Sequence, residues 1–262
     1  MTLESELARA FDEDVLERYG KRFVALLQAS GVVTPEVRRA LDLNCDTGYA
    51  TLPLADSLAV TAQVVAISDD RFRLKQLHQK LSAPIRRRIF PHKEGFRRLP
   101  FADGTFDAVW GSFPDRRAEP LKPLLRQMFR VLAPGGRLAL CLPVHGSFIE
   151  LIHACGGASG EGGLQELMAS APQLPTVEGL CQALERQGAA EVVAAQESFV
   201  LAVAPPAGED RLVARHLAPL WLKNSREAPA RLDEAVREPM EVRVQLACVT
   251  ARRDRPLDDT TP

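Results

Sequence analysis

The chain has 262 residues, 46% of them hydrophobic, and a formal net charge of −1. This length and apolar content suit one large α/β domain, or one domain with an insertion, built around a substantial core. The near-zero charge gives no overall field that would attract nucleic acid or an anionic membrane, so we expect neither as a partner.

The cysteines and the first residues bear on the compartment. Five cysteines are scattered without a CxxC pair, which indicates reduced thiols and neither a disulfide framework nor a metal site. The first residues lack the basic and apolar regions of a signal peptide, and no apolar run approaches about 18 residues. We therefore expect a cytoplasmic protein, and we interpret arginine clusters such as Arg97-Arg98 as solvated.

Strand and helix signals alternate through the first half of the chain. Apolar residues at three- and four-residue steps predict a helix over 3–29, ended by Gly31. Strands are predicted at 40–43, 64–67, 87–90, 106–110 and 138–144, with helices at 48–58, 71–81 and 121–132. This alternation predicts a parallel sheet with helices on both faces, joined by right-handed crossovers.

The second half is less regular. Its patterns predict helices at 147–154, 177–187 and near 210–222 and 231–237, strands at 191–203 and 241–250, and a glycine-rich loop at 156–163.

A glycine-rich turn is expected after the first strand of a nucleotide-binding α/β fold. The stretch at that point is Leu41-Asp42-Leu43-Asn44-Cys45-Asp46-Thr47-Gly48-Tyr49. Glycine in such a turn either adopts angles that a Cβ forbids or lets the backbone approach a ligand. Asn44 and Asp46 stand at two of the three positions, and both residue types tolerate left-handed angles. We therefore expect the replacements to affect ligand binding more than folding.

Three segments together resemble the class I S-adenosylmethionine-dependent methyltransferases, especially the small-molecule type with a ubiquinone-biosynthesis-like domain. They are the stretch above, Leu-Pro-Phe-Ala-Asp-Gly-Thr-Phe-Asp-Ala-Val at 99–109 and Arg-Val-Leu-Ala-Pro-Gly-Gly-Arg-Leu at 130–138. The resemblance covers roughly residues 35–145. It implies a Rossmann-like, seven-stranded, mostly parallel sheet with an antiparallel last strand, helices on both faces and a helical lid.

This fold implies a division of the chain. We expect an N-terminal helical cap (1–34), a methyltransferase-like core (35–204), a helical lid between the last two strands (205–240), a final strand (241–253) and a disordered tail (254–262).

The resemblance also implies where S-adenosylmethionine would bind. The implied cofactor-binding residues are Asp42, Asn44, Asp46, Gly48, Ser68, Asp69 and Glu94. The family's ribose-binding acid matches Ser68, with Asp69 directly after it, and the acid facing the adenine matches Gly95, with Glu94 beside it. Asp46 is expected either to repel the cofactor's carboxylate or to pair with its amino group.

Candidate catalytic residues follow the fourth and fifth strands. His145 lies at the edge where ligands bind, so it is a candidate general base; the alternative is a loop histidine that ends the strand. Ser112, Phe113 and Asp115 either position a substrate or form a turn at Pro114.

Two functions follow from this pattern. The first, favoured by analogy of fold, is a methyltransferase acting on a small or medium-sized cytosolic substrate. The second is a catalytically degenerate relative that binds a protein partner as a scaffold or regulator. A nucleic-acid methyltransferase is disfavoured, because the chain is near neutral and Gly111-Ser112-Phe113-Pro114 is no base-flipping motif.

Overall fold

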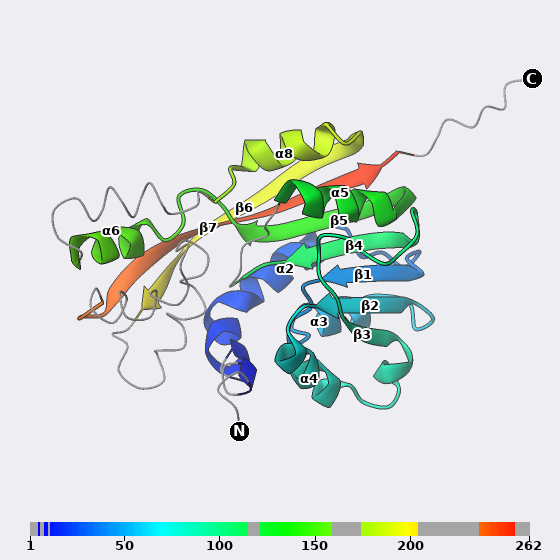
Figure 1. Cartoon of the computed structure of the whole chain (residues 1–262), viewed down its shortest axis with the longest axis horizontal. Coiled ribbons are helices and arrows are strands. Elements are labelled where there is room, and N and C mark those ends of the chain that lie inside the picture. The colour runs from blue at the N-terminus through cyan, green and yellow to red at the C-terminus, as the bar shows by residue number, and fades with distance from the viewer. Residues whose placement is uncertain are drawn as a thin grey trace, which may run out of the picture.

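A seven-stranded sheet forms the centre of the molecule, with helices on both faces (Figure 1). The computed structural model describes residues 5, 8, 9, 11–114, 121–158, 174–203 and 236–254. The strand order is β3-β2-β1-β4-β5-β7-β6. This confirms the predicted Rossmann-like sheet with an antiparallel last strand.

The first five strands are parallel, as the alternation of elements predicts. They are β1 (Arg39–Leu43), β2 (Gln63–Ser68), β3 (Ile89–Lys93), β4 (Phe106–Ser112) and β5 (Leu132–Pro143). The last strand, β7 (Met240–Arg253), runs antiparallel between β5 and β6 (Ala189–Val203). In Figure 1 the β6–β7 ribbon extends well beyond the other strands. Strand order reverses between β1 and β4, where an open α/β sheet binds its ligand.

Two hydrophobic clusters fill the space on either side of the sheet. On one face the π-helix η1 (Phe11–Gly20), α2 (Lys21–Ala29), α3 (Thr51–Asp56) and α4 (Arg71–Lys80) bury residues such as Phe23 and Leu77 against Trp110. On the other face α5 (Leu121–Val131) and α8 (Val177–Glu185) bury residues such as Leu125 and Leu184. Successive residues of β1 point to alternate clusters, as the two-residue period of a strand requires.

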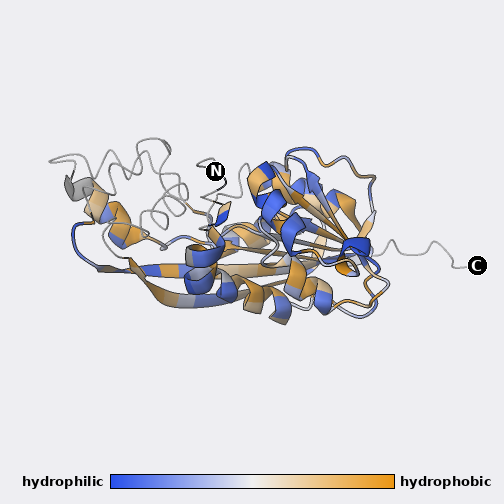
Figure 2. Cartoon of the chain, turned by 90° about the horizontal axis from the view of Figure 1, so that it is seen from below, coloured by the Kyte–Doolittle hydropathy of each residue, from blue (hydrophilic) through white to orange (hydrophobic). Residues whose placement is uncertain are grey.

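The remaining helices are the short η2 (Ile85–Arg87) and α6 (Ile149–Ala158). Figure 2 shows hydrophobic residues concentrated on the strands, with hydrophilic residues interspersed along the covering helices. Within the described residues, no helix is both long and apolar enough to cross a membrane.

Several predicted boundaries differ from the structure. The helix predicted from 48 begins at Thr51, because the residues before it form the turn. The strand predicted from 138 begins at Leu132, so that Pro134-Gly135-Gly136 lies within β5, where Gly135 has φ 81° and the register with β4 shifts. The loop predicted from 156 is still helical to Ala158. Most of the predicted lid (205–240) and of the tail, and Asp115, lie outside the described residues.

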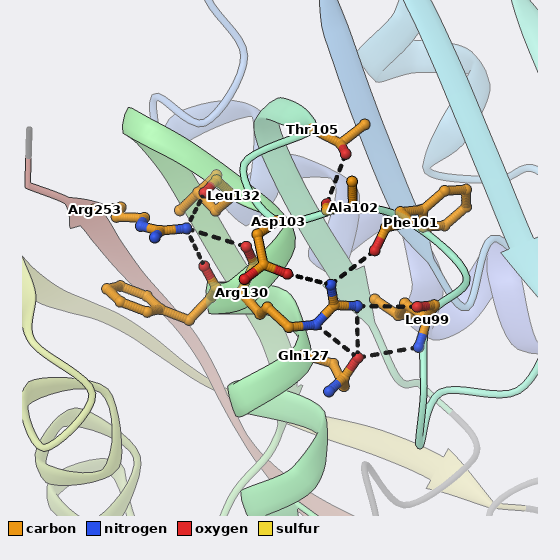
Figure 3. Close-up of polar contacts among 10 residues, drawn as sticks. Leu99, Phe101, Ala102, Asp103, Thr105, Gln127, Arg130, Leu132 and Arg253 are labelled. Carbon is orange, nitrogen blue, oxygen red and sulfur yellow. Dashed lines mark hydrogen bonds and ion pairs between the residues drawn. The ribbon is translucent and has the colours of Figure 1, made fainter.

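Arg130 ties two of the three family-like segments together (Figure 3). Its guanidinium donates to the carbonyl oxygens of Phe101 (2.7 Å) and Leu99 (2.9 Å) and pairs with Asp103 (2.7 Å). The Gln127 side-chain oxygen accepts from Arg130 (2.9 Å) and from the Leu99 amide (3.1 Å). We call this set of contacts the Arg130 clamp; it fixes the segment between β3 and β4 on α5.

Candidate functional site

The turn after β1, residues 44–48, has the backbone of a glycine-rich turn with only its last glycine. Asn44 has φ 63°, Asp46 has φ 47° and Gly48 has φ 89°. These left-handed angles suit glycine, asparagine and aspartate better than other residues. A Cβ on Gly48 would overlap the Leu77 side chain of α4. Gly48 therefore allows this turn, which we call the β1 turn, to pack against α4.

Asn44 is buried and binds back to the sheet. Its amide nitrogen donates to the carbonyl oxygen of Ser112 (2.6 Å) and to the Asp46 carboxylate (3.1 Å). Its amide oxygen is buried and receives no hydrogen bond from the described residues. The side chain thus connects the end of β1 to the end of β4, across the point where the strand order reverses.

Asp46 forms an ion pair with Arg73 of α4. The guanidinium lies 3.0 Å from the Asp46 carboxylate and 3.6 Å from that of Asp70. The side chains of Arg73 and Asp46 are 8% and 0% exposed. Arg73 also lies over the Phe11 ring, 4.2 Å from its centroid. The charge that Asp46 brings to the β1 turn is therefore neutralised by the protein itself.

The N-terminal helix covers the β1 turn. The Thr47 hydroxyl donates to Asp12 of η1, and Lys80 binds both Asp12 (2.6 Å) and the Thr47 carbonyl (3.0 Å). Phe11 packs edge-on against Tyr49, with centroids 6.0 Å apart. Residues 44–47 are at most 1% exposed. The turn is therefore closed in this structure.

Asp42 is a buried carboxyl just before the turn. Burial raises its pKa to about 7, against the opposing effects of a hydrogen bond from Thr51 (2.6 Å) and the neighbouring Trp110 indole. The nearby Asp46 charge raises this pKa further. Asp42 is therefore close to half protonated at neutral pH.

The ends of β2 and β3 bring three predicted residues into one neighbourhood. Ser68 is buried, and its hydroxyl accepts from the Asp70 amide (3.2 Å). Asp69 is exposed beside it, while Asp70 caps α4 by accepting from Phe72 (2.8 Å). Glu94 is half-buried, and its amide donates to the Ser68 carbonyl (3.0 Å). The adjacent strands thus place Ser68 and Glu94 together, with the exposed Asp69 next to them.

His145 lies elsewhere at the same edge, exposed after β5. Its backbone amide donates to the Pro175 carbonyl (2.9 Å). Ser112, at the end of β4, has its hydroxyl against the Tyr49 hydroxyl. Among the described residues, no group of His, Cys, Asp or Glu side chains is suited to a metal ion.

The residues that close the turn were not found from the sequence. Phe11, Asp12, Arg73 and Lys80 lie on helices and show only amphipathic spacing in the sequence. One signal existed: an acidic residue at a buried turn needs a cation nearby, because an unpaired buried charge is costly. The sequence contains many arginines and lysines that meet this condition, so the partner follows only from the fold.

Comparison with known proteins agrees with the strand order and the turn. Residues 40–136 match a family model described as a methyltransferase domain. The demethylmenaquinone methyltransferase of Lactiplantibacillus plantarum is 35% identical over 103 residues, 39% of this chain and 43% of that protein. The ubiquinone/menaquinone biosynthesis C-methyltransferase UbiE of Klebsiella pneumoniae is 34% identical over 124 residues, 47% of this chain and 48% of that protein.

Over residues 40–136 the chain is similar to the class I S-adenosylmethionine-dependent methyltransferases, and it has their fold. The similarity is distant, and the chain spans less than half the length of these curated relatives. A putative methyltransferase from Bacillus halodurans has the same fold, with a TM-score of 0.58 at 16% identity, covering 90% of this chain and all of that one. The [4+2]-cyclase SpnF also shares it, with a TM-score of 0.56 at 20% identity, covering 90% of this chain and 81% of that one.

S-adenosylmethionine is the cofactor that membership of this family implies. The residues of the β1 turn do not fit its methionine end in this conformation. Asp46 is already paired with Arg73, and both are buried. Asn44 has a buried oxygen without a donor, which a ligand ammonium would suit, yet no part of that side chain is exposed. We therefore assign no reaction step to the cofactor in this state.

Proposed function

We propose that this chain is a catalytically degenerate member of the methyltransferase family that serves as a binding or regulatory protein. The observation that carries this proposal is the buried ion pair between Asp46 and Arg73. The pair would occupy the polar end of the ancestral cofactor site, so that the fold is retained while loading of S-adenosylmethionine is lost.

The free energy needed to break this ion pair supports the proposal. Breaking a buried salt bridge by removing its partner costs about 3–5 kcal/mol. A ligand that must first separate Asp46 from Arg73 loses affinity accordingly, and every 1.4 kcal/mol is about tenfold. We therefore expect the methionine end of the cofactor to bind at least about a hundredfold more weakly than it would in an open turn.

The residue that the resemblance places at the cofactor's ribose supports the same proposal. Ser68 stands where the resemblance implies an acid, and its hydroxyl already accepts from the Asp70 amide. A hydroxyl also binds a sugar hydroxyl less strongly than a carboxylate does, because the hydrogen bond is not charge-assisted.

The test measures ligand-induced thermal stabilisation with S-adenosylhomocysteine and with 5′-methylthioadenosine, which lacks the amino acid end. We expect the wild-type chain to show no preference for S-adenosylhomocysteine. The double variant Asn44→Gly, Asp46→Gly removes both side chains and is expected to gain stabilisation from S-adenosylhomocysteine alone. A ligand at about 100 times its Kd stabilises by roughly 2.7 kcal/mol, so this gain is readily measured.

A small-molecule methyltransferase that opens on binding is the second candidate. Two observations favour it: the turn keeps left-handed angles at Asn44, Asp46 and Gly48, and the exposed Asp69 stands beside Ser68. This candidate expects wild-type stabilisation by S-adenosylhomocysteine well above that by 5′-methylthioadenosine. That result would overturn the first proposal, and screening of small hydroxyl, amine and carbon acceptors would then follow, with His145→Ala testing a general base.

A further inference from the structure

A groove between α5 and α8, on the face of the sheet away from the β1 turn, gathers positive charge. It encloses about 510 Å³ and is lined by Arg97, Lys122, Pro123, Arg126, Gln127, Ala183, Arg186 and Gln187. Among the described residues, its lining contains four cationic side chains and no acidic one. That volume lies within the range of small-molecule sites, about 300–1,000 Å³.

No acidic side chain of the described residues neutralises the four cations. Within the described part of the chain, Arg97, Lys122 and Arg126 form no ion pair, and Arg186 binds only the neutral Gln182 side chain (3.1 Å). Lys122 and Arg126 are four residues apart on one helix, an arrangement of like charges that destabilises the helix. An arrangement that weakens the fold and lacks a counter-charge is typical of a site for an anion.

The wall of the groove formed by α5 and the segment before β4 is held in place by the Arg130 clamp. The Gln127 oxygen is used by Leu99 and Arg130, which leaves its amide NH₂ as the part that can donate into the groove (Figure 3). The same bonds fix Leu99, two residues after Arg97, against α5. The donors of the groove are therefore placed by rigid elements, which lowers the cost of ordering them around a ligand.

The chemistry of the donors favours linked phosphates. Arginine presents a planar fork of N–H groups that matches phosphate oxygens, and lysine adds a point charge. The first turn of α5, with Lys122, adds the positive end of a helix dipole. A single carboxylate carries one negative charge, so four positive charges around one small volume suit a ligand that carries several negative charges.

The surroundings argue against a nucleic acid as the occupant. Glu178 and Glu185 lie on α8 close enough to Cys181 to raise the pKa of that thiol, after the larger effect of burial. The helical period places both acidic residues on the side of α8 away from Ala183, and neither lines the groove, so the positive charge of the described residues does not continue across α8. A nucleic-acid surface requires positive charge that continues along the backbone path.

We propose that the groove binds a soluble ligand carrying two or more linked phosphates, such as a nucleoside polyphosphate or an inorganic polyphosphate. The proposal is independent of whether the β1 turn admits S-adenosylmethionine, because the two sites share no residue.

Titration calorimetry on the full chain tests this, with tripolyphosphate, ATP, adenosine and a single-stranded oligonucleotide as probes. We expect tripolyphosphate and ATP to bind one site, adenosine not to bind, and affinity to fall as salt rises from about 50 to 300 mM. Equal affinity for the first two indicates recognition of the phosphates alone, and tighter binding of ATP adds a base contact; either result supports the proposal.

Paired variants with the same change in charge locate the site. The double variant Arg126→Gln, Arg186→Gln should weaken tripolyphosphate binding at least about tenfold. The control Arg39→Gln, Arg243→Gln alters two exposed arginines outside the groove. It should leave the affinity for tripolyphosphate within about twofold of the wild-type value. The proposal is overturned if no phosphate probe binds below millimolar concentration, if both double variants weaken binding equally, or if adenosine or the oligonucleotide binds better than ATP.

Discussion

Asp46 and Arg73 show how a carboxylate is accommodated in a buried turn. A carboxylate at a glycine position brings a charge into a buried place, and the protein compensates with a guanidinium from α4 and an aromatic ring from η1. Among the described residues no cation pairs with Asp42, so burial stabilises the neutral form of its carboxyl. The two carboxyls, four residues apart, therefore differ in charge at neutral pH.

Replacing Asp42 with asparagine should change how stability depends on pH. The pKa of Asp42 is about 7 in the folded chain, raised from 3.8, so the folded state holds a proton that the unfolded state releases. Stability from this group is full at low pH and falls as pH rises from about 4 to 7. The expected loss is on the order of 4 kcal/mol at most.

The Asp42→Asn side chain would remain neutral and keep an acceptor for Thr51. Urea unfolding at several pH values should therefore show that the variant's free energy of unfolding increases relative to that of the wild type as pH rises from about 4 to 7. Parallel profiles for the two proteins would contradict the assigned pKa.

At the scale of elements, α5 organises both the family-like segments and the groove. Arg130 holds the segment before β4, and Arg253 of β7 donates to the carbonyl oxygens of Leu132 (2.6 Å) and Arg130 (3.1 Å) (Figure 3). Periodicity located α5 correctly, yet it gave no means of telling Arg130 from Arg126, because hydrogen-bond partners distant in sequence leave no local pattern.

Arg130→Lys should destabilise the fold, since lysine cannot reach Leu99, Phe101 and Asp103 with one planar group. We expect a loss of about 2–3 kcal/mol, because partly buried carbonyl acceptors lose their donor. Arg126→Lys, one turn earlier on an exposed position, is the matched control and should stay within about 0.5 kcal/mol. Urea unfolding, with midpoints that shift at unchanged slopes, would measure the loss of stability in each variant. Equal losses in Arg130→Lys and Arg126→Lys would contradict the role of the clamp.

For the molecule as a whole, closure of the β1 turn depends on η1 packing across the sheet edge. The N-terminal helix, α4 and the turn are far apart in sequence, yet Asp12, Lys80 and Thr47 meet in one cluster. The same sheet presents the basic groove on its opposite face. One fold thus separates the closed β1 turn from the candidate groove.

Phe11→Ala should open the β1 turn while leaving the sheet folded. The ring is fully buried against Tyr49 and Arg73, and removing a buried phenylalanine costs about 3–5 kcal/mol. Native-state hydrogen exchange should show faster exchange at the Gly48 amide, which donates to the Cys45 carbonyl within the turn, than at the amides of β1. Phe90→Ala, at a partly exposed position of β3, is the control; uniform acceleration in both variants would argue against a cover formed by η1.

The sequence by itself determined the alternation of strands and helices, the parallel sheet and the position of the unusual turn. Those features depend on local periodicity, on turn chemistry and on the handedness of crossovers, all of which are encoded within short segments. It also placed Asn44 and Asp46 at positions where the resemblance implies glycines, and it left two roles open for Asp46.

Only the tertiary structure showed that Asp46 pairs with Arg73, and only it revealed the groove. Arg73 reaches Asp46, and Arg97 and Arg186 meet beside α5, because the fold brings together segments that are separated along the chain. Side-chain pairing of this kind depends on distance and burial in three dimensions, and the sequence contains many charged residues that fit the pattern equally well. The closure of the β1 turn therefore depends on tertiary packing, whereas the fold class follows from local patterns in the sequence.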